Sequence, residues 1–224
     1  MMASISSTKS RILEEARRLA NEAGFDRLTT RELAERCSIN EGNLYYHFKT
    51  KAQIAEALFR AFEHEAQDLF EGALLPGAST SPGEVGELLR RAIDRLRGWC
   101  LLSWKYRALM RDGHVLFRLE PALQPAVAEL TATLSSRVTL LIDELRRARI
   151  LSIDEAQLAP LVANIFIVST YWLGYVVQQT GESYPDESCL DWGFDQIMAL
   201  IMPYRTWITR LILRRRPELL RLRP

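Results

Sequence analysis

The sequence predicts an all-α protein built in two parts. Apolar residues recur at helical spacing along most of the 224 residues, and no segment alternates as a half-buried strand requires. Glycine and proline stand at the ends of these periodic segments, where helices start and stop. A chain of this length can bury a sizeable core and form one or two domains.

In the N-terminal part the sequence predicts helices of short and medium length. Its first helix is expected to carry Ile12, Leu13, Ala16, Leu19, Ala20 and Ala23 on its inner face and to end at Gly24 as a C-cap. Two short helices follow within residues 29–51. A longer helix then runs from Lys51 to about Phe70, with Ile54, Ala55, Leu58, Phe59 and Phe62 on one face. Residues 72–83, rich in Gly, Pro, Ser and Ala, predict a loop.

The C-terminal part predicts longer helices. They span about Glu84–Arg111, Pro121–Arg149, Asp154–Gly181 and Leu190–Leu213. Asp154 is placed to cap the third of these, and Pro203 is expected to kink the last. An irregular connection is expected at Gly113 and His114, and a turn over 182–188. His114 could gate a pocket or sit at a solvated bend, and the bend is favoured.

Residues 29 to 51 carry the most informative pattern. Thr29 and Glu32 have the spacing of a capping box, which predicts a helix start. After Ser38-Ile39-Asn40, a second short helix places Leu44 and Phe48 four residues apart, so both should point inward. Two short helices separated by about three residues have the spacing of a helix-turn-helix.

The outer side of the second short helix is polar and aromatic. Gly42, Asn43 and Tyr46 fall opposite Leu44 and Phe48, and Tyr45 and His47 flank them. Such a surface suits contact with a polar, anionic partner.

These residues resemble the TetR/AcrR-type bacterial transcriptional regulators. The resemblance rests on Leu28-Thr29-Thr30-Arg31-Glu32-Leu33-Ala34, on Gly42-Asn43-Leu44-Tyr45-Tyr46-His47-Phe48 and on Lys51, and it covers roughly residues 9 to 60. In that family the turn usually carries a small residue followed by Gly and Val, whereas here it reads Cys37-Ser38-Ile39. A Ser with positive φ at this place would cost about 1 kcal/mol relative to Gly.

The resemblance implies a helix-turn-helix DNA-binding domain over residues 1–50 and a helical ligand-sensing and dimerisation domain over residues 51–224. It implies a sequence-specific transcriptional regulator, a repressor that a small, largely apolar ligand releases from its operator. The expected partners are double-stranded DNA with a palindromic operator, the small-molecule effector and a second copy of the chain.

The residue types suggest a division of labour in DNA binding. Hydroxyl, imidazole and ammonium donors suit phosphate oxygens, which predicts phosphate contacts for Thr30, Tyr45, His47 and Lys51. Arg31, Asn43 and Tyr46 are expected to reach base edges in the major groove. Gly42 would let the start of the helix approach the DNA closely. The alternative is that Tyr45 and His47 only cover the domain surface.

Charge restricts where DNA can bind. The net charge is +1, but residues 1–60 carry +2, residues 61–204 carry −7 and residues 205–224 carry +6. The acidic middle should not face phosphates. The run Arg214-Arg215-Arg216 could form a second DNA contact, but a solvated helix end is favoured. Three cysteines without metal spacing, and no apolar leader, predict a cytoplasmic protein with reduced thiols.

The segment Leu161–Val177 is almost continuously apolar. It is short for a bilayer span, which takes about 20 residues, and polar residues interrupt it. Burial on both sides is favoured, against the domain core and against a second subunit. The helix near 158–179 and the last helix are therefore expected to pair with their two-fold copies as a four-helix bundle. In the last helix the expected contacts are Trp192, Phe194, Ile197, Ile201, Tyr204, Ile208 and Leu211.

Aromatic residues crowd the C-terminal part. They could simply pack in the core, or they could line a pocket, because Trp and Tyr combine an apolar face with a polar tip. The candidate ligand residues are Trp99, Trp104, Phe117, Phe166, Tyr171, Trp172 and Tyr175.

No enzyme motif is present in the sequence. It lacks a GxSxG elbow, a GxGxxG loop, a P-loop and an HExxH motif. No catalytic residue, metal ligand or cofactor is predicted. The alternative function is a helical carrier of hydrophobic ligands, or an enzyme, without DNA binding; neither would explain why Asn43, Tyr46 and His47 point outward.

Overall fold

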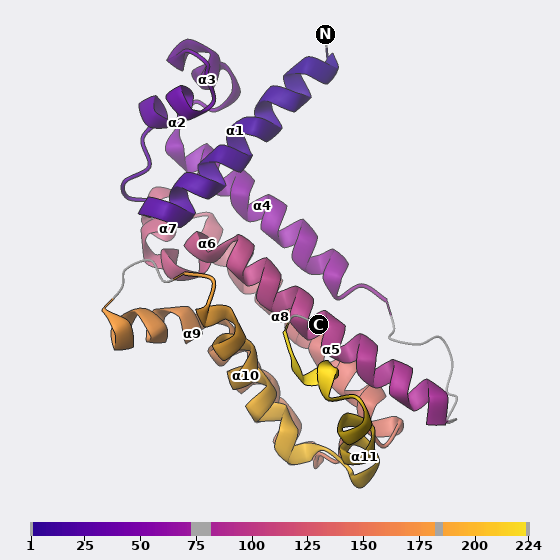
Figure 1. Ribbon diagram of the computed structural model, residues 1–224. Coiled ribbons are helices and arrows are strands. Elements are labelled where there is room, and N and C mark those ends of the chain that lie inside the picture. Colours follow the sequence, from indigo (N-terminus) through magenta and orange to yellow (C-terminus); the bar gives the residue numbers. More distant parts are fainter. Residues whose placement is uncertain (1, 73–81, 182–185, 223–224) are drawn as a thin grey trace.

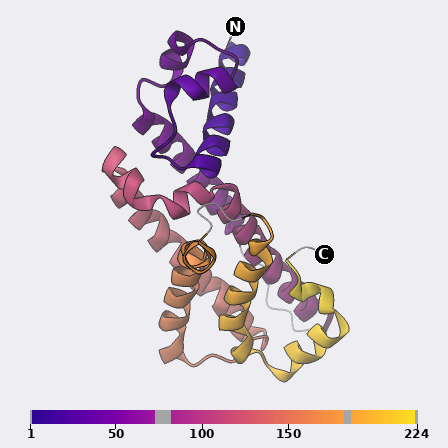
Figure 2. The same cartoon turned by 60° about the vertical axis from the view of Figure 1, so that its left-hand side comes forward.

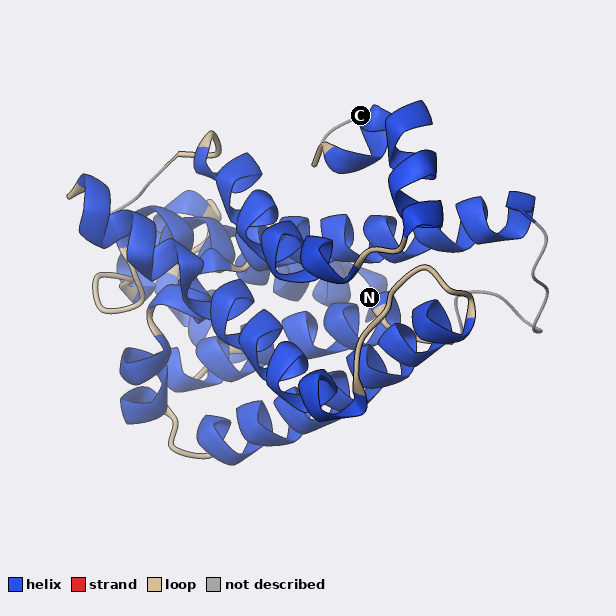
Figure 3. Cartoon of the chain, turned by 90° about the horizontal axis from the view of Figure 1, so that it is seen from below, coloured by secondary structure: helices blue, strands red, loops and turns tan. Residues whose placement is uncertain are grey.

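The computed structural model describes residues 2–72, 82–181 and 186–222. In chain order the helices are α1 (Met2–Ala23), α2 (Thr30–Arg36), α3 (Glu41–His47), α4 (Lys51–Leu69), α5 (Pro82–Lys105), α6 (Arg107–Arg111), α7 (Gly113–Leu119), α8 (Leu123–Arg147), α9 (Glu155–Thr180), α10 (Cys189–Ile201), the 3-10 turn η1 (Met202–Tyr204), α11 (Trp207–Arg215) and the 3-10 turn η2 (Pro217–Leu220). Within these residues Figure 3 shows helices and loops and no strand. The only β pairing among them is one isolated bridge between Leu151 and Arg205. The all-α prediction is confirmed. Most of the predicted loop over 72–83 and of the turn over 182–188 lies outside the described residues.

Helices α1, α2 and α3 form a small unit at one end of the molecule, and α4 leads from it along α5 (Figures 1 and 2). As predicted, Gly24 follows the first helix with a positive φ of 92°. The buried side chains of α1–α3 share one continuous core with Ile54, Ala55 and Leu58 of α4. Because this core crosses residue 50, α4 is fixed to the N-terminal unit by its first half.

The larger part is a bundle of α5, α8, α9 and α10. At its far end the chain folds back after α11, and the Arg97 guanidinium of α5 donates to the carbonyl oxygens of Glu218, Leu219 and Arg221 at 2.7 to 2.9 Å. These bonds attach the C-terminal segment to the bundle.

The predicted helix over 84–111 is wrong in one respect, because it breaks at Tyr106. Main-chain groups at the break bond to α1 instead of to their own helix. The Asn21 side chain donates to Lys105 O at 2.8 Å and accepts from Ala108 N at 3.0 Å, and Arg17 Nη1 also donates to Lys105 O at 2.7 Å. The irregular connection predicted at Gly113 and His114 is also wrong, since both residues lie in the short helix α7.

The predicted last helix over 190–213 is likewise divided, not merely kinked. Pro203 lacks an N–H, and the helix ends before it. Thr206 then caps α11, with its hydroxyl accepting from Thr209 N at 3.4 Å. The intervening residues pair with the segment before α9, where Ser152 N donates to Tyr204 O at 2.8 Å and Thr206 N to Ile150 O at 3.1 Å. Asp154 is the N-cap residue of α9, but its side chain makes no capping hydrogen bond.

Helices α9 and α10 approach closely where Trp172 lies over Gly193. A Cβ atom built at Gly193 would come within 2.8 to 2.9 Å of three atoms of the Trp172 indole. Both residues are buried. Glycine is therefore required at position 193 by packing, and the Trp172 ring fills the contact between the two helices.

Replacing Gly193 by Ala should destabilise the protein, because the rigid indole ring must move out of a packed core. Overpacking of this kind costs about 1–3 kcal/mol, which thermal or denaturant unfolding can measure. Gly86→Ala in α5 is the matched control, since nothing lies within 4 Å of a Cβ at that position. In a helix, Gly→Ala without a clash gains up to about 1 kcal/mol. Equal stability changes in the two variants would contradict the packing argument.

Candidate nucleic-acid interface and ligand cavities

The turn between α2 and α3 is built by local hydrogen bonds. The Thr29 hydroxyl accepts from Glu32 N at 3.2 Å, as the predicted cap requires, and Asn40 Oδ1 accepts from Asn43 N at 2.7 Å. Ser38 has a φ of 51°, so the residue predicted to need a positive φ adopts one. The two caps and this turn fix the start of α3 relative to α2.

Helix α3 has one inner and one outer side. Leu44 and Phe48 are buried, as predicted, and hold the helix on the N-terminal core. Asn43 and Tyr45 on the outer side are exposed, and Tyr46 is 67% exposed. Since the inner side is fixed by packing and capping, the outer side chains are presented by a rigid element.

The predicted DNA-binding residues lie together on this surface. The hydroxyls of Thr30 and Tyr45 are 3.3 Å apart, which joins the start of α2 to α3. The rings of Tyr46 and His47 pack edge to face at 5.2 Å between centroids. Arg31 is exposed and pairs with Glu35 at 3.1 Å.

Two further residues of this set lie at the edges of α3. Lys51, at the start of α4, donates from Nζ to Asp26 O at 3.0 Å, and burial lowers the pKa of its ammonium group. An ammonium has three N–H donors, so two remain for another acceptor. Gly42 is exposed, and a Cβ there would meet only Asn40 Oδ1, at an ordinary 3.4 Å. Packing within the chain therefore does not require glycine at position 42.

The larger part of the molecule contains a cavity of about 460 Å³, here called the large cavity. Its walls come from α4 through α9 and include Phe59 and Phe62 of α4, Trp99 of α5, Phe117 of α7 and Phe166 and Tyr171 of α9. Arg111 and His114 add polar groups to the wall. His114, for which a solvated bend was favoured, is exposed and lies at this cavity.

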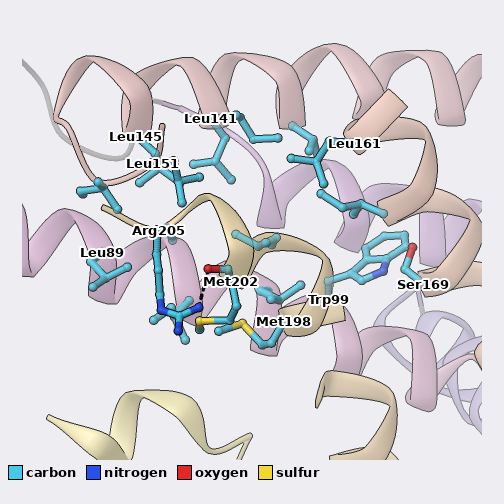
Figure 4. A pocket seen from close by; sticks show the side chains of 18 of the residues that line it. Leu89, Trp99, Leu141, Leu145, Leu151, Leu161, Ser169, Met198, Met202 and Arg205 are labelled. Carbon is cyan, nitrogen blue, oxygen red and sulfur yellow. Dashed lines mark hydrogen bonds between the residues drawn. The ribbon is translucent and has the colours of Figure 1, made fainter. Parts of the chain in front are cut away.

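A second cavity of about 110 Å³, here called the small cavity, lies deeper in the bundle between α5, α8, α9 and α10. Most of its wall is aliphatic (Figure 4), and Met202, Thr209 and Leu213 belong to its lining. Trp99, Leu134 and Phe166 line both cavities and separate them.

Four of the seven candidate ligand residues line a cavity: Trp99, Phe117, Phe166 and Tyr171. The other three lie outside both cavities, and their packing gives the reason. Trp172 is held against Gly193, Tyr175 stacks on Trp192 at 5.6 Å between ring centroids, and Arg107 covers the Trp104 ring at 4.6 Å. These three residues therefore line neither of the two cavities, and a ligand contact for them stays a prediction.

The sequence analysis missed the aliphatic wall of the small cavity and the one charged residue in it, Arg205. Arg205 belongs to the predicted last helix only if that helix is continuous. Its position in the wall depends on the break after Ile201, for which Pro203 was the only signal.

The cavities contact α4 through aromatic rings. Trp99 packs on Phe62 at 6.0 Å and on Phe70 at 5.9 Å between centroids. Nearby, Glu65 of α4 accepts from the Tyr106 hydroxyl at 2.6 Å and from Lys105 Nζ at 2.6 and 2.7 Å. Burial and the bond to Glu65 raise the pKa of Tyr106, which keeps its hydroxyl a donor at neutral pH.

A second set of contacts joins the start of α7 to the N-terminal unit. Phe25 N donates to the buried Asp112 carboxylate at 3.0 Å, and Arg111 pairs with the same carboxylate at 2.8 Å while donating to Ala20 O at 3.0 Å. A buried carboxylate with both a cation and a main-chain donor is satisfied, so this contact has a defined geometry.

Among the described residues, no cluster of His, Cys, Asp and Glu could hold a metal ion. Of the three cysteines, Cys37 and Cys100 are buried, and burial raises the pKa of the Cys100 thiol to about 12. One described helix, α9, is long and apolar enough to cross a membrane by length and composition, with 39% of its most apolar window buried. One side of α9 is exposed in the single chain, with Ile167 at 55%, Tyr171 at 67% and Tyr175 at 52%.

Comparisons with known proteins agree on one family. Residues 12–58 match the family model described as bacterial regulatory proteins of the tetR family, and residues 78–210 match the TetR model described as bacterial transcriptional repressor. The chain is 30% identical over 145 residues to the nucleoid occlusion factor SlmA of Haemophilus influenzae, and the match covers 63% of each chain, under two thirds of that relative's length. It is 35% identical over 81 residues to the HTH-type transcriptional regulator TtgR of Pseudomonas putida, which is 36% of each chain.

The fold is also similar to that of solved TetR-family structures. A TetR-family transcriptional regulator from Marinobacter aquaeolei VT8 superposes with a TM-score of 0.73 at 24% identity, covering 96% of this chain and 98% of that one. The second matched family model alone covers more than half of the chain. The chain therefore belongs to the TetR family of bacterial regulatory proteins.

Proposed function

We propose that the protein is a sequence-specific DNA-binding transcriptional regulator, a repressor that a small, largely apolar ligand releases from its operator. The observation that carries the proposal is the outer side of α3, where Asn43, Tyr45 and Tyr46 are exposed on a short helix held by Leu44 and Phe48. A helix of this kind fits the major groove. Membership in a family of bacterial transcriptional repressors supports the same function.

In this proposal the residues divide between phosphates and bases. Thr30, Tyr45, His47 and Lys51 hold phosphate oxygens through hydroxyl, imidazole and ammonium donors. Arg31, Asn43 and Tyr46 reach base edges, with Arg favouring guanine and Asn favouring adenine. Gly42 lets the start of α3 approach the DNA closely. The protein itself has room for a side chain at position 42, but that side chain would meet the DNA.

The repressor acts as a homodimer on a palindromic operator. A single helix-turn-helix offers few base contacts, and two copies double the interface. The exposed side of α9, formed by Ile167, Tyr171 and Tyr175, supports pairing with a second copy, and Trp192 of α10 stacks against it. Phe194 and Ile197, which were expected in this interface, are buried within the single chain and do not belong to it.

Ligand release requires a ligand to bind one domain arrangement better than the other. The large cavity has Phe59 and Phe62 of α4 in its wall, and α4 starts at Lys51 beside α3. A ligand there can shift α4 relative to the bundle. A tenfold loss of DNA affinity requires about 1.4 kcal/mol of such coupling. The regulator would act in the bacterial cytoplasm, where the DNA is.

The alternative is a helical carrier of apolar ligands that does not bind DNA. Selection of bound fragments from genomic DNA, followed by gel shifts at rising salt, separates the two functions. The regulator should form a sequence-selective complex that persists at salt concentrations where binding to random DNA is lost. A carrier should form no such complex.

Asn43→Ala should weaken binding to the selected operator by about 1–3 kcal/mol and relax the preference at one base pair. Asn43 is exposed, and only its backbone N–H takes part in the helix cap, so the fold should be unaffected. The measurement is the affinity for the operator and for single-base variants. An equal loss on operator and random DNA would contradict base reading by Asn43.

Lys51→Ala should weaken binding to every DNA sequence alike. The slope of log binding constant against log salt concentration should flatten by about 0.9, as expected for one lost phosphate contact. Arg214→Ala is the matched control, because Arg214 lies in α11 in the part of the molecule far from α3 (Figure 2). An unchanged slope in Lys51→Ala would remove Lys51 from the phosphate contacts. A flattened slope in Arg214→Ala would instead bring the basic C-terminal run into the interface.

Ile167→Asp should dissociate the dimer, since it places a carboxylate in the apolar face proposed to pair across the two-fold axis. Leu140→Asp is the matched control, because Leu140 is an exposed apolar residue of α8. Light scattering at micromolar concentration measures the mass. A monomeric wild-type protein, or a dimeric Ile167→Asp variant, would overturn this interface.

A further inference from the structure

The surface of the small cavity is almost entirely apolar. Among the residues that line it, those with a polar side-chain atom are Trp99, Ser169, Arg205 and Thr209. Because the surface carries so little polar area, the polar atoms of these four side chains do not face the cavity. They belong to its wall through their carbon atoms.

The two hydroxyl groups are bonded within the chain. Ser169 Oγ donates to Phe166 O at 3.2 Å, and Thr209 Oγ1 donates to Ile150 O at 2.6 Å. Both serine and threonine are buried, so these bonds turn the hydroxyls toward main-chain acceptors rather than toward the cavity.

The two nitrogen-bearing side chains also present carbon to the cavity. Arg205 donates from Nη1 to Met202 O at 2.5 Å, a bond that Figure 4 shows. The indole N–H of Trp99 is a hydrogen-bond donor, and it would add polar surface if it pointed into the cavity. A molecule in the small cavity therefore meets neither a charge nor a hydrogen-bonding group.

Such a surface selects by polarity. A buried water molecule needs two to four polar partners, which this cavity does not provide. A hydroxyl, carboxylate or amine would give up its hydrogen bonds to water and gain none in return. The small cavity therefore favours neutral hydrocarbons over alcohols, acids and amines.

The volume of the cavity selects by size. The small cavity measures about 110 Å³. An engineered apolar cavity of about 150 Å³ takes up benzene or xenon, which sets the scale at about six carbon atoms. Trp99, Leu134 and Phe166 separate the small cavity from the large one, so a longer molecule would have to displace one of these side chains.

The shape of the wall suits an aromatic ring. In Figure 4 leucines lie along one side of the cavity, Met198 and Met202 lie on the opposite side, and Trp99 lies at one end. Methionine is adaptable, and its sulfur makes favourable contacts with the edges of aromatic rings. Phe70, Trp99 and Phe166 in the wall add rings that can pack edge to face or offset on a bound ring.

A cavity of this size also lowers the stability of the folded chain. Atoms that line a cavity lose packing contacts on one side, and the loss grows with the volume. A ligand of matching size restores these contacts. Since it binds only the folded state, it also stabilises that state.

We infer that the small cavity is a binding site for one neutral hydrocarbon, an aromatic ring of about the size of benzene without a hydrogen-bonding substituent. The site is distinct from the large cavity, whose wall includes Arg111 and His114. It adds a second ligand site to the proposed function and does not depend on that function, because it concerns binding to the helical bundle alone.

The test is isothermal titration of the purified full chain with benzene, in wild-type protein and in two variants. Ala92→Leu adds three carbon atoms to the wall of the small cavity from α5 and should lower the benzene affinity at least about tenfold. Val127→Phe, in the wall of the large cavity, is the matched control and should stay within about twofold of wild type. No loss in Ala92→Leu, or a loss in Val127→Phe as large as that in Ala92→Leu, would overturn the site. Circular dichroism checks that each variant is folded.

Two further ligands test the selectivity. The binding that Ala92→Leu removes is the binding in the small cavity. For this component, benzene should bind at least about tenfold more tightly than phenol, because the phenol hydroxyl would be buried without a partner. Mesitylene, whose three methyl groups make it too large, should also bind at least about tenfold more weakly than benzene. Equal affinity for benzene and phenol would overturn the apolar selectivity, and equal affinity for benzene and mesitylene would overturn the limit on size.

A crystal of the wild-type protein under xenon pressure tests the site without any variant. Xenon is apolar, scatters X-rays strongly and binds apolar cavities. It should lie in the small cavity, among Leu141, Ile165 and Met198. Xenon found only in the large cavity, or in neither, would overturn the inference. Gel shifts without hydrocarbon test the proposed function alone, so benzene binding by a protein that binds no operator would overturn that function and support the site.

Discussion

The structure depends on the hydrogen bonds between α1 and the break after α5. A continuous helix would bond Lys105 O and Ala108 N internally, but here the Asn21 side chain bonds to both. Arg17 adds a second donor to Lys105 O. Buried main-chain groups need partners, so Asn21 stabilises the break and the contact between the domains together. The same break turns Tyr106 toward Glu65 of α4. The position of the N-terminal unit is therefore coupled to the conformation of residues 105–112.

This coupling gives the ligand cavities a route to α3. The wall residues of the large cavity include Arg111 and Phe62, and each belongs to one of the contacts that fix the N-terminal unit. Arg111 pairs with Asp112 and reaches Ala20, and Phe62 packs on Trp99 and Tyr106. A molecule that enters the cavity changes the surroundings of both. Packed cores switch between discrete arrangements rather than deforming smoothly, and in the proposed function a ligand at these residues would act on α4 through them.

The fold and the surface of α3 could be predicted from sequence because their signals are local. Thr29 with Glu32, the spacing of Leu44 and Phe48, and the glycine after α1 each act within a few residues. The two helix breaks could not be predicted in the same way. At Tyr106 the main-chain group of Lys105 bonds to Asn21, which lies 84 residues away in the sequence, instead of to its own helix. No residue near the break indicates it. The break near Pro203 had a signal, but whether a proline kinks or ends a helix depends on partners such as Ile150 and Ser152.

The pocket was predicted only in part, because residue type does not reveal which side of a buried helix faces empty space. Trp99 and Trp172 are both buried aromatic residues, yet one lines both cavities and the other fills the space over Gly193. The difference lies in the partner helix, where a glycine admits the second ring. Arg205 escaped notice for a related reason: a cation in a basic C-terminal segment of net charge +6 is unremarkable in sequence. Arg205 lines the small cavity only because the chain turns after η1, which brings its side chain against an aliphatic wall.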